Sequence, residues 1–494
     1  MTITPLDAWV RDIINNNITN DTVKNDAVLR ADIQAFQLDR LNATIETALK
    51  SSYYRQLFSN QIQNMSEPAR KNSAALTDET RIASTTRDLS PSRSSSPFRD
   101  TLPSRASSST RDLSLSQIAS PSPHFQSLSQ LSQLPAIDAE VLKKEGMRLV
   151  CAPQGEIARI VTLQTSGSTD SPKRVFFTER DLELTVDYFA NGLKTLTAAG
   201  DSMAILLPCE SPDGIGDLIA RGLMRIPVTP VRHGLVGDIA QCVNVLRETN
   251  AKSLVGVPVQ ALALARYCAA KKIKLDIRAV LLSTDNIPRI VVSELERLWG
   301  CEVFEHYGMT EMGLGGAIDC EAHDGYHIRE NDLLVEILDE KGCPLKDGEY
   351  GEVVFTTLTR EGMPLIRYKT GDRSMLLQGR CACGSRLRRL APLNGRIGGD
   401  TVMECGTVIR IHEFDKVLFA IPEVSGFTLT AERSENRLKI AIESQESAGA
   451  AKPEQISKAL ESSGLIRGVD AAITVTLLPD TLPPVKGKRV VIVR

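Results

Sequence analysis

Residues 165–173 have the composition of a loop that binds phosphate groups. They read Thr-Ser-Gly-Ser-Thr-Asp-Ser-Pro-Lys and directly follow a short apolar run at 160–163. Hydroxyl and backbone N–H groups donate hydrogen bonds to phosphate oxygens, Gly167 lets the backbone come close to a ligand, and Lys173 supplies a positive charge. The segment lacks the Gly-Lys-Ser/Thr ending of a Walker A loop, and an ordinary polar turn would share its composition. Both interpretations stay open for this segment alone.

A second polar cluster ends the apolar stretch at 303–306 and reads Glu305-His-Tyr-Gly-Met-Thr-Glu311. An aromatic ring, a glycine, a hydroxyl and a carboxylate at the end of a strand are suited to stacking on a purine, cradling a phosphate and holding Mg²⁺. An ordinary junction between a strand and a loop is the alternative.

Two further segments also have a chemical interpretation. In Arg367-Tyr-Lys-Thr-Gly-Asp372, an aspartate that follows a glycine turn can accept hydrogen bonds from both hydroxyls of a ribose. In Pro484-Val-Lys-Gly-Lys-Arg489, Lys488 lies beside a glycine near the C-terminus and can reach a site on another domain. Each has a plain alternative: the first is a turn and the second a solvated basic tail.

In this order and spacing, the four segments together resemble the adenylate-forming superfamily, which includes acyl-CoA synthetases, luciferases and peptide-synthetase adenylation domains. The stretch 351–368, Gly-Glu-Val-Val-Phe-Thr-Thr-Leu-Thr-Arg-Glu-Gly-Met-Pro-Leu-Ile-Arg-Tyr, resembles the phenylacetate–CoA ligase branch in particular. The resemblance covers about residues 134–494, and a helix that ends near Phe58 can extend it toward the N-terminus.

The resemblance implies a set of residues that bind the nucleotide. The loop for the β- and γ-phosphates comprises Thr165, Ser166, Gly167, Ser168, Thr169 and Lys173. Tyr307 and Gly308 would lie beside adenine, Asp372 would hold the ribose, and Arg396 would lie at the hinge end of the large domain.

The resemblance also implies three catalytic residues. Thr310 would contact the α-phosphate, Glu311 would bind Mg²⁺, and Lys488 would bridge the substrate carboxylate and the α-phosphate. These roles agree with the chemistry, because attack of a carboxylate on a phosphate brings anions together and cations must stabilise the developing charge.

Three positions depart from the family pattern. Asp170 replaces a glycine beside the phosphate loop, and Ser283-Thr-Asp-Asn286 replaces a Gly-Ala-Glu-Pro-like loop for adenine. Gly398-Gly-Asp400 makes the hinge pattern looser than usual. These departures bear on turnover rate and nucleotide geometry and leave the reaction class unchanged.

A group of cysteines and histidines has the composition of a structural zinc site. Cys320 precedes His327 by seven residues, and Cys381-Ala-Cys383 follows a turn-like Gly-Arg pair. Three thiolates and one imidazole complete a closed tetrahedral Zn²⁺ site, and some relatives in the resembled branch carry such a set. Unmetallated thiols are the alternative, and we expect His327 as the fourth ligand rather than His323.

The overall composition excludes several classes of function. A net charge of −3 over 494 residues and an aromatic content of 4% argue against binding of nucleic acid or of an anionic membrane. No apolar run approaches the roughly 20 residues that a membrane helix needs, and the N-terminus does not read as a signal peptide. We expect a cytoplasmic protein whose 10 cysteines are mostly free thiols.

The hydrophobic pattern predicts an α/β fold with mostly parallel sheets. Apolar strands expected at 160–163, 203–207, 227–231, 254–257, 279–282 and 303–306 alternate with helices at 178–193, 215–223, 236–247, 259–270 and 290–299. Strands at 333–338 and 351–358 then form a hairpin. In such folds, ligands bind beyond the carboxyl ends of the parallel strands.

Four segments of the chain are expected to behave differently. Residues 1–65 form a helical part of the large domain, with a helix at 26–59, and residues 66–132 are a Ser-rich insertion too polar to pack. Residues 133–396 form the large adenylation domain, and residues 397–494 form a small mobile α+β C-terminal domain. The small domain should contain helices at 412–420 and 453–463 and strands at 426–431, 438–443 and 472–478.

The resemblance implies an ATP-dependent acid–CoA ligase that forms an acyl-adenylate with release of pyrophosphate, and then an acyl-CoA with release of AMP. By analogy the acid is an aryl or arylacetic acid such as phenylacetate, and the regions Tyr188–Phe189 and Pro208–Asp217 are expected to line its pocket. ATP, Mg²⁺, coenzyme A and a structural Zn²⁺ are the implied cofactors, and assembly as a homodimer is left open. The alternatives are an adenylating enzyme with an acceptor other than CoA, and a non-catalytic nucleotide-binding protein.

Overall fold

The computed structural model describes residues 4–17, 26–59, 124–163, 172–483 and 489–494. Two predicted features lie outside these residues: the phosphate loop Thr165–Thr169 with Asp170, and Lys488. Most of the Ser-rich insertion also lies outside them. Among the described helices, none is long and apolar enough to cross a membrane.

An eight-stranded sheet forms the centre of the fold, in the order β13-β9-β8-β7-β6-β5-β3-β4. Its five parallel strands are β3 (Ser202–Leu206), β4 (Thr229–Arg232), β5 (Ser253–Gly256), β6 (Ala279–Leu282) and β7 (Glu302–Tyr307). Every residue of β5 and β6 is buried, as expected for parallel strands that are covered on both faces. The predicted α/β class with a parallel sheet is therefore confirmed.

The crossover helices also follow the prediction closely. They are α6 (Ile215–Leu223), α7 (Ile239–Glu248), α8 (Pro258–Ala270) and α9 (Arg289–Trp299). Three short antiparallel strands extend the sheet beyond β7: β8 (Ala317–Ile318), β9 (Tyr326–Ile328) and β13 (Arg389–Leu390). These strands of two or three residues carry no readable periodicity, so the pattern did not predict them.

A hairpin of β1 (Ile157–Leu163) and β2 (Lys173–Thr178) leads into α5 (Glu179–Gly192). The loop predicted to end at Lys173 is shorter than expected, because Lys173 is the first residue of β2 and pairs with Leu163. At the start of α5, Asp181 N–H donates to Thr178 Oγ1 and Thr178 N–H donates to the Asp181 carboxylate. This is the capping box that the sequence predicts.

A second sheet contains β10 (Leu333–Leu338), β11 (Gly351–Thr357) and β12 (Tyr368–Ser374), all antiparallel. The first two are the predicted hairpin. Asp372 was predicted to follow a plain glycine turn, and the structure places it inside β12 instead. The pairing of β11 with β12 shifts register there, and Gly371 takes a φ of +74° that favours glycine.

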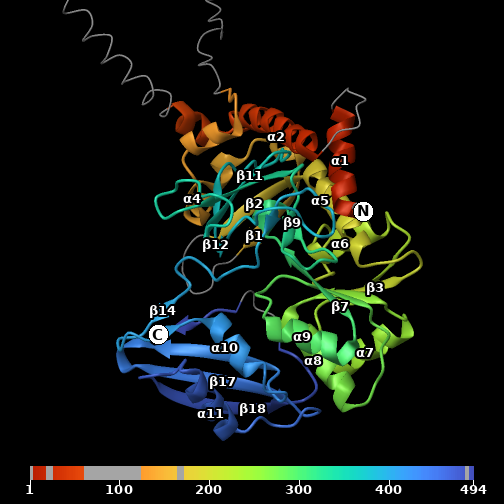
Figure 1. Ribbon diagram of the computed structural model, residues 1–494, viewed down its shortest axis with the longest axis vertical. Helices are drawn as coiled ribbons and strands as arrows, with labels where there is room; N and C mark the ends of the chain where they lie inside the picture. The colour runs from red at the N-terminus through yellow and green to blue at the C-terminus, as the bar shows by residue number, and fades with distance from the viewer. Residues whose placement is uncertain (1–3, 18–25, 60–123, 164–171, 484–488) are drawn as a thin grey trace, which may run out of the picture.

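The N-terminal helices pack on the large domain, as Figure 1 shows. They are α1 (Pro5–Asn17) and α2 (Asp26–Ala48), and residues 52–59 form a further helix after a turn that interrupts the predicted helix 26–59. Residues 124–132 were assigned to the Ser-rich insertion, but Phe125 and Leu131 are buried in the same core. The short 3₁₀ helix Leu128–Gln133 and α4 (Ala139–Glu145) continue this layer.

The C-terminal domain has a four-stranded sheet in the order β18-β17-β16-β19. Its elements are α10 (Ile411–Leu418), β16 (Gly426–Glu432), β17 (Arg437–Gln445), α11 (Pro453–Ser463), β18 (Asp470–Leu478) and β19 (Ile492–Val493), after a small hairpin of β14 (Thr401–Val402) and β15 (Val408–Ile409). All but β14, β15 and β19 were predicted. Figure 1 shows this domain in blue beside α8 and α9, and the apolar side chains of both parts form one continuous core.

Candidate functional site

Lys173 and Glu311 meet at the centre of the candidate site. Lys173 Nζ donates to Glu311 Oε1 at 2.7 Å, and the Glu311 side chain is buried. The hydroxyl of Tyr368 donates to the same carboxylate oxygen at 3.2 Å. Residues from β2, from the turn after β7 and from β12 therefore converge on one carboxylate. The structure brings together the end of the phosphate loop and the predicted Mg²⁺ ligand.

A second group of predicted residues lies around Asp372. The hydroxyl of Tyr307 donates to Asp372 Oδ2 at 3.1 Å, and Arg396 Nε lies 3.3 Å from Asp372 Oδ1. Burial, followed by the charge of Asp372, raises the pKa of Tyr307 well above its usual value, so the phenol stays protonated and donates. Arg396 is held by a second bond to the carbonyl of Thr370 at 2.9 Å. The predicted adenine, ribose and hinge residues thus form one connected unit.

A cleft of about 460 Å³ opens beside Arg396. Its walls include Arg373 and Arg396 from the large domain and Arg410 and His412 from the C-terminal domain. This volume lies in the range of clefts that hold small molecules. The cleft lies between the two domains and beside the residue that pairs with Asp372.

The turn that carries Thr310 and Glu311 depends on close backbone packing. A Cβ atom on Gly308 would lie 2.4 Å from the carbonyl oxygen of Leu314, so only glycine fits. The N–H groups of Met312 and Leu314 both donate to the carbonyl of Met309, which closes a compact turn. Thr310 stays half-exposed at its start, where a phosphate can reach the hydroxyl.

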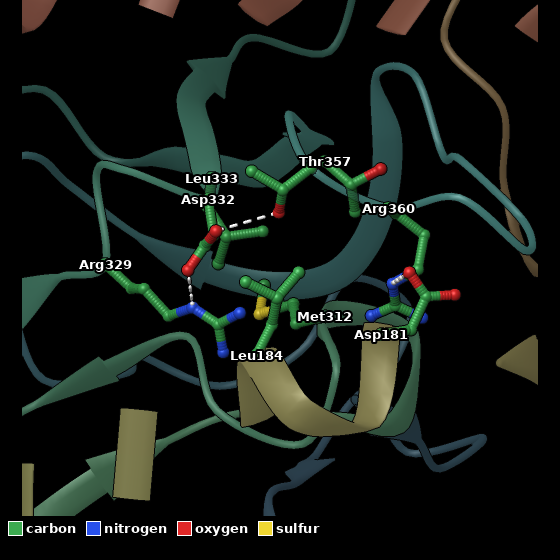
Figure 2. Close-up of a pocket in the computed structure, with 9 residues that line it drawn as sticks. Asp181, Leu184, Met312, Arg329, Asp332, Leu333, Thr357 and Arg360 are labelled. Atoms are coloured by element: carbon green, nitrogen blue, oxygen red, sulfur yellow. Dashed lines mark hydrogen bonds and ion pairs between the residues drawn. The ribbon is translucent and has the colours of Figure 1, made fainter. Parts of the chain in front are cut away.

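Two buried arginines support this turn from behind, and the sequence did not predict them. Figure 2 shows Arg329 and Arg360 extending toward each other from opposite sides of Met312. They line a cavity of about 10 Å³, room for one water, and Nη1 of each has no hydrogen-bond partner among the described residues. Burial lowers the pKa of Arg360, and Asp181 offsets part of this effect. Arg360 lies within the segment 351–368 that carries the family resemblance, so its position was readable although its role was not.

The loop after β6 also faces the site. Ser283 Oγ and His306 Nδ1 are 2.9 Å apart, because β6 and β7 are neighbouring parallel strands and end at the same edge of the sheet. Burial lowers the pKa of His306 to about 4, so its ring is neutral near pH 7. Tyr188 and Phe189, the residues expected near the acid pocket, pack their buried rings about His306 at centroid distances of 6.0 and 6.3 Å.

The predicted zinc ligands come together in space. The ligand atoms of Cys320, His327, Cys381 and Cys383 all lie within 4.8 Å of one another, and the residues are largely buried. His323, the alternative ligand, instead lies with Nδ1 2.6 Å from a carboxylate oxygen of Asp319. The donor set and its compactness fit a tetrahedral Zn²⁺ site of three thiolates and one imidazole.

The sequence of this chain is similar to those of known proteins. Residues 116–358 match the family model described as AMP-binding enzyme. Phenylacetate-coenzyme A ligase of Thermus thermophilus is 29% identical over 317 residues, which span 61% of this chain and 68% of that protein. The Escherichia coli protein of the same name is 30% identical over 286 residues, 55% of this chain and 63% of that protein. The chain thus matches about two thirds of the length of these relatives.

Solved structures show the same fold. A 2-hydroxyisobutyryl-CoA ligase in a postadenylation state superposes with a TM-score of 0.62 at 22% identity, over 74% of this chain and 81% of that one. The same ligase in its thioesterification state, with CoA bound, superposes with a TM-score of 0.52 at 21% identity, over 74% and 82%.

Proposed function

We propose that this chain is an AMP-forming acid–CoA ligase of the adenylate-forming enzymes, in the phenylacetate–CoA ligase-like branch, and that it acts on an aryl or arylacetic acid such as phenylacetate. The acid and ATP give acyl-AMP and pyrophosphate, and coenzyme A then gives the acyl-CoA and AMP. The observation that supports this most directly is the convergence of Lys173, Glu311 and Tyr368 on one carboxylate beside the Tyr307–Asp372–Arg396 unit.

In the first step, an oxygen of the substrate carboxylate attacks the α-phosphorus and the bond to the departing pyrophosphate breaks. We propose that Lys173, at the end of the loop Thr165–Thr169, and the hydroxyl of Thr310 stabilise the phosphate charges. The Lys488 ammonium would bridge the carboxylate and the α-phosphate. Tyr307, Gly308 and Asp372 would hold the nucleoside, with Arg396 fixing Asp372 in place.

Glu311 is the residue that would hold Mg²⁺. It fits this role because Lys173 and Tyr368 both bond to Oε1, whereas no bond of the described residues engages Oε2. Bound there, Mg²⁺ would neutralise charge on the phosphates of ATP. Lys173 would then exchange its contact with Glu311 for one with a phosphate oxygen.

In the second step, the CoA thiolate attacks the acyl carbonyl carbon and the bond to AMP breaks. We propose that the acid pocket lies next to the buried ring of Tyr188, which packs against the neutral imidazole of His306 with ring centroids 6.0 Å apart, and that these rings favour an aromatic acid as substrate. In the cysteine and histidine cluster, His327 lies on β9, Cys320 follows β8, and Cys381 and Cys383 precede β13. A bound Zn²⁺ would therefore hold these three short strands together.

The proposal is tested by a screen of carboxylic acids for ATP-dependent pyrophosphate release, run with and without CoA. We expect phenylacetate or a related aryl acid to give pyrophosphate without CoA, and AMP with continued turnover when CoA is present. Pyrophosphate release that never leads to a CoA thioester would replace CoA with another acceptor. No release with any aryl or arylacetic acid would contradict the proposed substrate class.

The variant Lys488→Ala separates binding from chemistry. We expect it to bind ATP with nearly unchanged affinity and to lose acyl-adenylate formation by at least about 100-fold. Lys486→Ala, two residues earlier in the same segment, is the matched control and should retain activity. Full activity of Lys488→Ala would contradict the role proposed for this lysine.

A further inference from the structure

Arg489, the residue after Lys488, is shared between acidic residues of the two domains. Its Nη1 and Nη2 donate to both carboxylate oxygens of Asp415 on α10, at 2.6 and 3.3 Å. Its Nε donates to Asp285 Oδ2 of the large domain at 2.8 Å, and its backbone N–H donates to Asp285 Oδ1 at 3.4 Å. One guanidinium thus connects the C-terminal domain to the loop after β6.

The connection is built within buried surroundings. The side chains of Asp415 and Asp285 are 0% and 7% exposed, and that of Arg489 is 18% exposed. The guanidinium also lies over the rings of Phe419 and Phe427, at 5.2 and 5.5 Å from their centroids. Since Asp415 and both rings belong to the C-terminal domain, Arg489 is fixed to that domain and reaches across to Asp285.

Asp285 is part of the candidate site itself. It lies in the loop Ser283–Asn286, which departs from the family's adenine loop and follows the carboxyl end of β6. Ser283 in this loop contacts His306, next to Tyr307. Asn286 Nδ2 donates to Asp415 Oδ2 at 3.0 Å, which adds a second bond between the domains.

The segment that contains Lys488 is attached to the large domain on both sides. Before it, the N–H of Leu482 donates to the carbonyl of Gly237 at 2.8 Å, and the N–H of Ile239 donates to the carbonyl of Asp480 at 3.1 Å. After it, Arg489 bonds to Asp285. The bonds at Leu482 involve only backbone atoms, whereas the bond at Arg489 depends on a carboxylate that a substitution can remove.

We infer that Asp285 is a positioning residue for the adenylation step: by binding Arg489 it holds the C-terminal domain in the orientation that this step requires. The catalytic part of this inference rests on the proposed role of Lys488. We expect the C-terminal domain to turn for thioester formation, which would break the bonds from Arg489 to Asp285 and from Asn286 to Asp415 and keep the bond from Arg489 to Asp415. Asp285 therefore favours the first half-reaction over the second.

The test uses Asp285→Asn in the full-length chain, since this variant keeps the shape of the side chain and leaves the buried Arg489–Asp415 pair intact. We expect acid-dependent exchange of pyrophosphate with ATP to fall at least about tenfold, with the KM for ATP nearly unchanged. Transfer of the acyl group from chemically prepared acyl-adenylate to CoA should be unchanged or faster. Asp276→Asn removes an exposed ion pair with Lys252 and serves as the matched control.

Hydrogen–deuterium exchange gives a readout that does not depend on catalysis. In Asp285→Asn, amides of α10 and of residues 283–288 should exchange faster than in the wild-type protein, and those of β16 and β17 should not. Equal loss of both half-reactions together with a lower Tm would reduce Asp285 to a structural role and overturn the inference. Unchanged rates and unchanged exchange would overturn it as well.

The proposed function and the inference about Asp285 can be contradicted independently of each other. If wild-type protein forms no adenylate with any acid, the proposed function fails, and faster exchange in α10 of Asp285→Asn still supports the link between the domains. If Lys488→Ala forms adenylate normally, the role of that lysine fails whatever Asp285→Asn does. If Lys488→Ala is inactive and Asp285→Asn matches the wild-type protein in every assay, the inference about Asp285 alone is wrong.

Discussion

Lys173 and Glu311 are 138 positions apart in the chain, and Lys173 Nζ lies 2.7 Å from Glu311 Oε1. One residue ends the predicted phosphate loop and the other is the predicted Mg²⁺ ligand. Neither motif alone distinguishes a nucleotide site from an ordinary turn. Their contact in the folded chain favours the nucleotide site, because it brings the two motifs to one place. A buried carboxylate and a cation each cost free energy when they lack a partner, and here each is the partner of the other.

Glu311→Gln should lower acid-dependent pyrophosphate release at least about 100-fold, because the amide is a weaker ligand for Mg²⁺ than the carboxylate. The remaining activity should require a higher concentration of Mg²⁺, which a titration of the metal would measure. Glu361→Gln is a suitable control, since the Glu361 side chain is exposed and forms an ion pair with Arg180 across 3.0 Å. Equal activity of Glu311→Gln and Glu361→Gln would exclude Glu311 as the Mg²⁺ ligand.

Gly308→Ala should destabilise the turn that carries Thr310 and Glu311, because the added Cβ would lie 2.4 Å from the carbonyl oxygen of Leu314. We expect a loss of about 1–3 kcal/mol in the free energy of unfolding, measured by urea denaturation, together with reduced adenylation. Gly155→Ala is the control, because a Cβ at that position meets nothing within 4 Å. If both variants unfold at the same urea concentration, the close packing at Gly308 is not required.

The cluster of Cys320, His327, Cys381 and Cys383 should hold about one zinc ion per chain, which elemental analysis of purified protein would measure. Cys381→Ser combined with Cys383→Ser should abolish binding and lower the Tm by at least about 5 °C, since metal binding contributes directly to folding. Cys343→Ser should change neither quantity, because Cys343 is exposed and lies outside the cluster. Less than about a tenth of an equivalent in protein never exposed to chelator would rule out the zinc site.

His306 should make the stability of the protein depend on pH between about 6.5 and 4. Burial lowers its pKa in the folded state from 6.5 to about 4, so the unfolded state binds a proton first as the pH falls. The contribution of His306 to the free energy of unfolding is therefore complete above pH 6.5 and declines as the pH falls from 6.5 to about 4. The total loss is on the order of 3 kcal/mol. Urea denaturation of His306→Asn should show a shallower decline, whereas His124→Asn, at an exposed position, should match the wild-type protein. A slope unchanged in His306→Asn would contradict the prediction.

Periodicity in the sequence predicts the elements that are long and buried on a regular face. β6 is a continuous apolar run, β5 has Leu254 and Val255 at its centre, and α9 buries Val291, Val292 and Leu295, so the types of these elements could be read directly. β2 was missed because it begins with Lys173 and Arg174, two cations that read as the end of a loop. The two cations are tolerated because β2 belongs to a two-stranded sheet and its first two residues are not buried.

The site was predictable as a set of residues but not as a set of contacts. The family resemblance named Tyr307, Asp372 and Arg396 as site residues, yet only the fold shows that Asp372 accepts a hydrogen bond from Tyr307 and pairs with Arg396. Arg360 and Asp285 act through side chains more than a hundred positions away in the chain, and no local pattern encodes such partners. For the cysteine cluster, the sequence analysis favoured His327 over His323, and the fold places His327 beside the three cysteines.

The attachment of Phe125 to α2 has a consequence for how this gene can change. The N–H of Phe125 donates to Asn42 Oδ1 at 2.8 Å, and Asn42 Nδ2 donates to the carbonyl of Phe125 at 3.1 Å. These two bonds to α2 fix the point at which the chain rejoins the large domain. The stability of this junction depends only weakly on how many codons separate residues 59 and 124, because doubling the length of a connection costs only about 0.6 kcal/mol. Evolution can therefore lengthen, shorten or replace that stretch, and a protein engineer can insert a reporter domain there, while the adenylating core keeps its N-terminal helices in place.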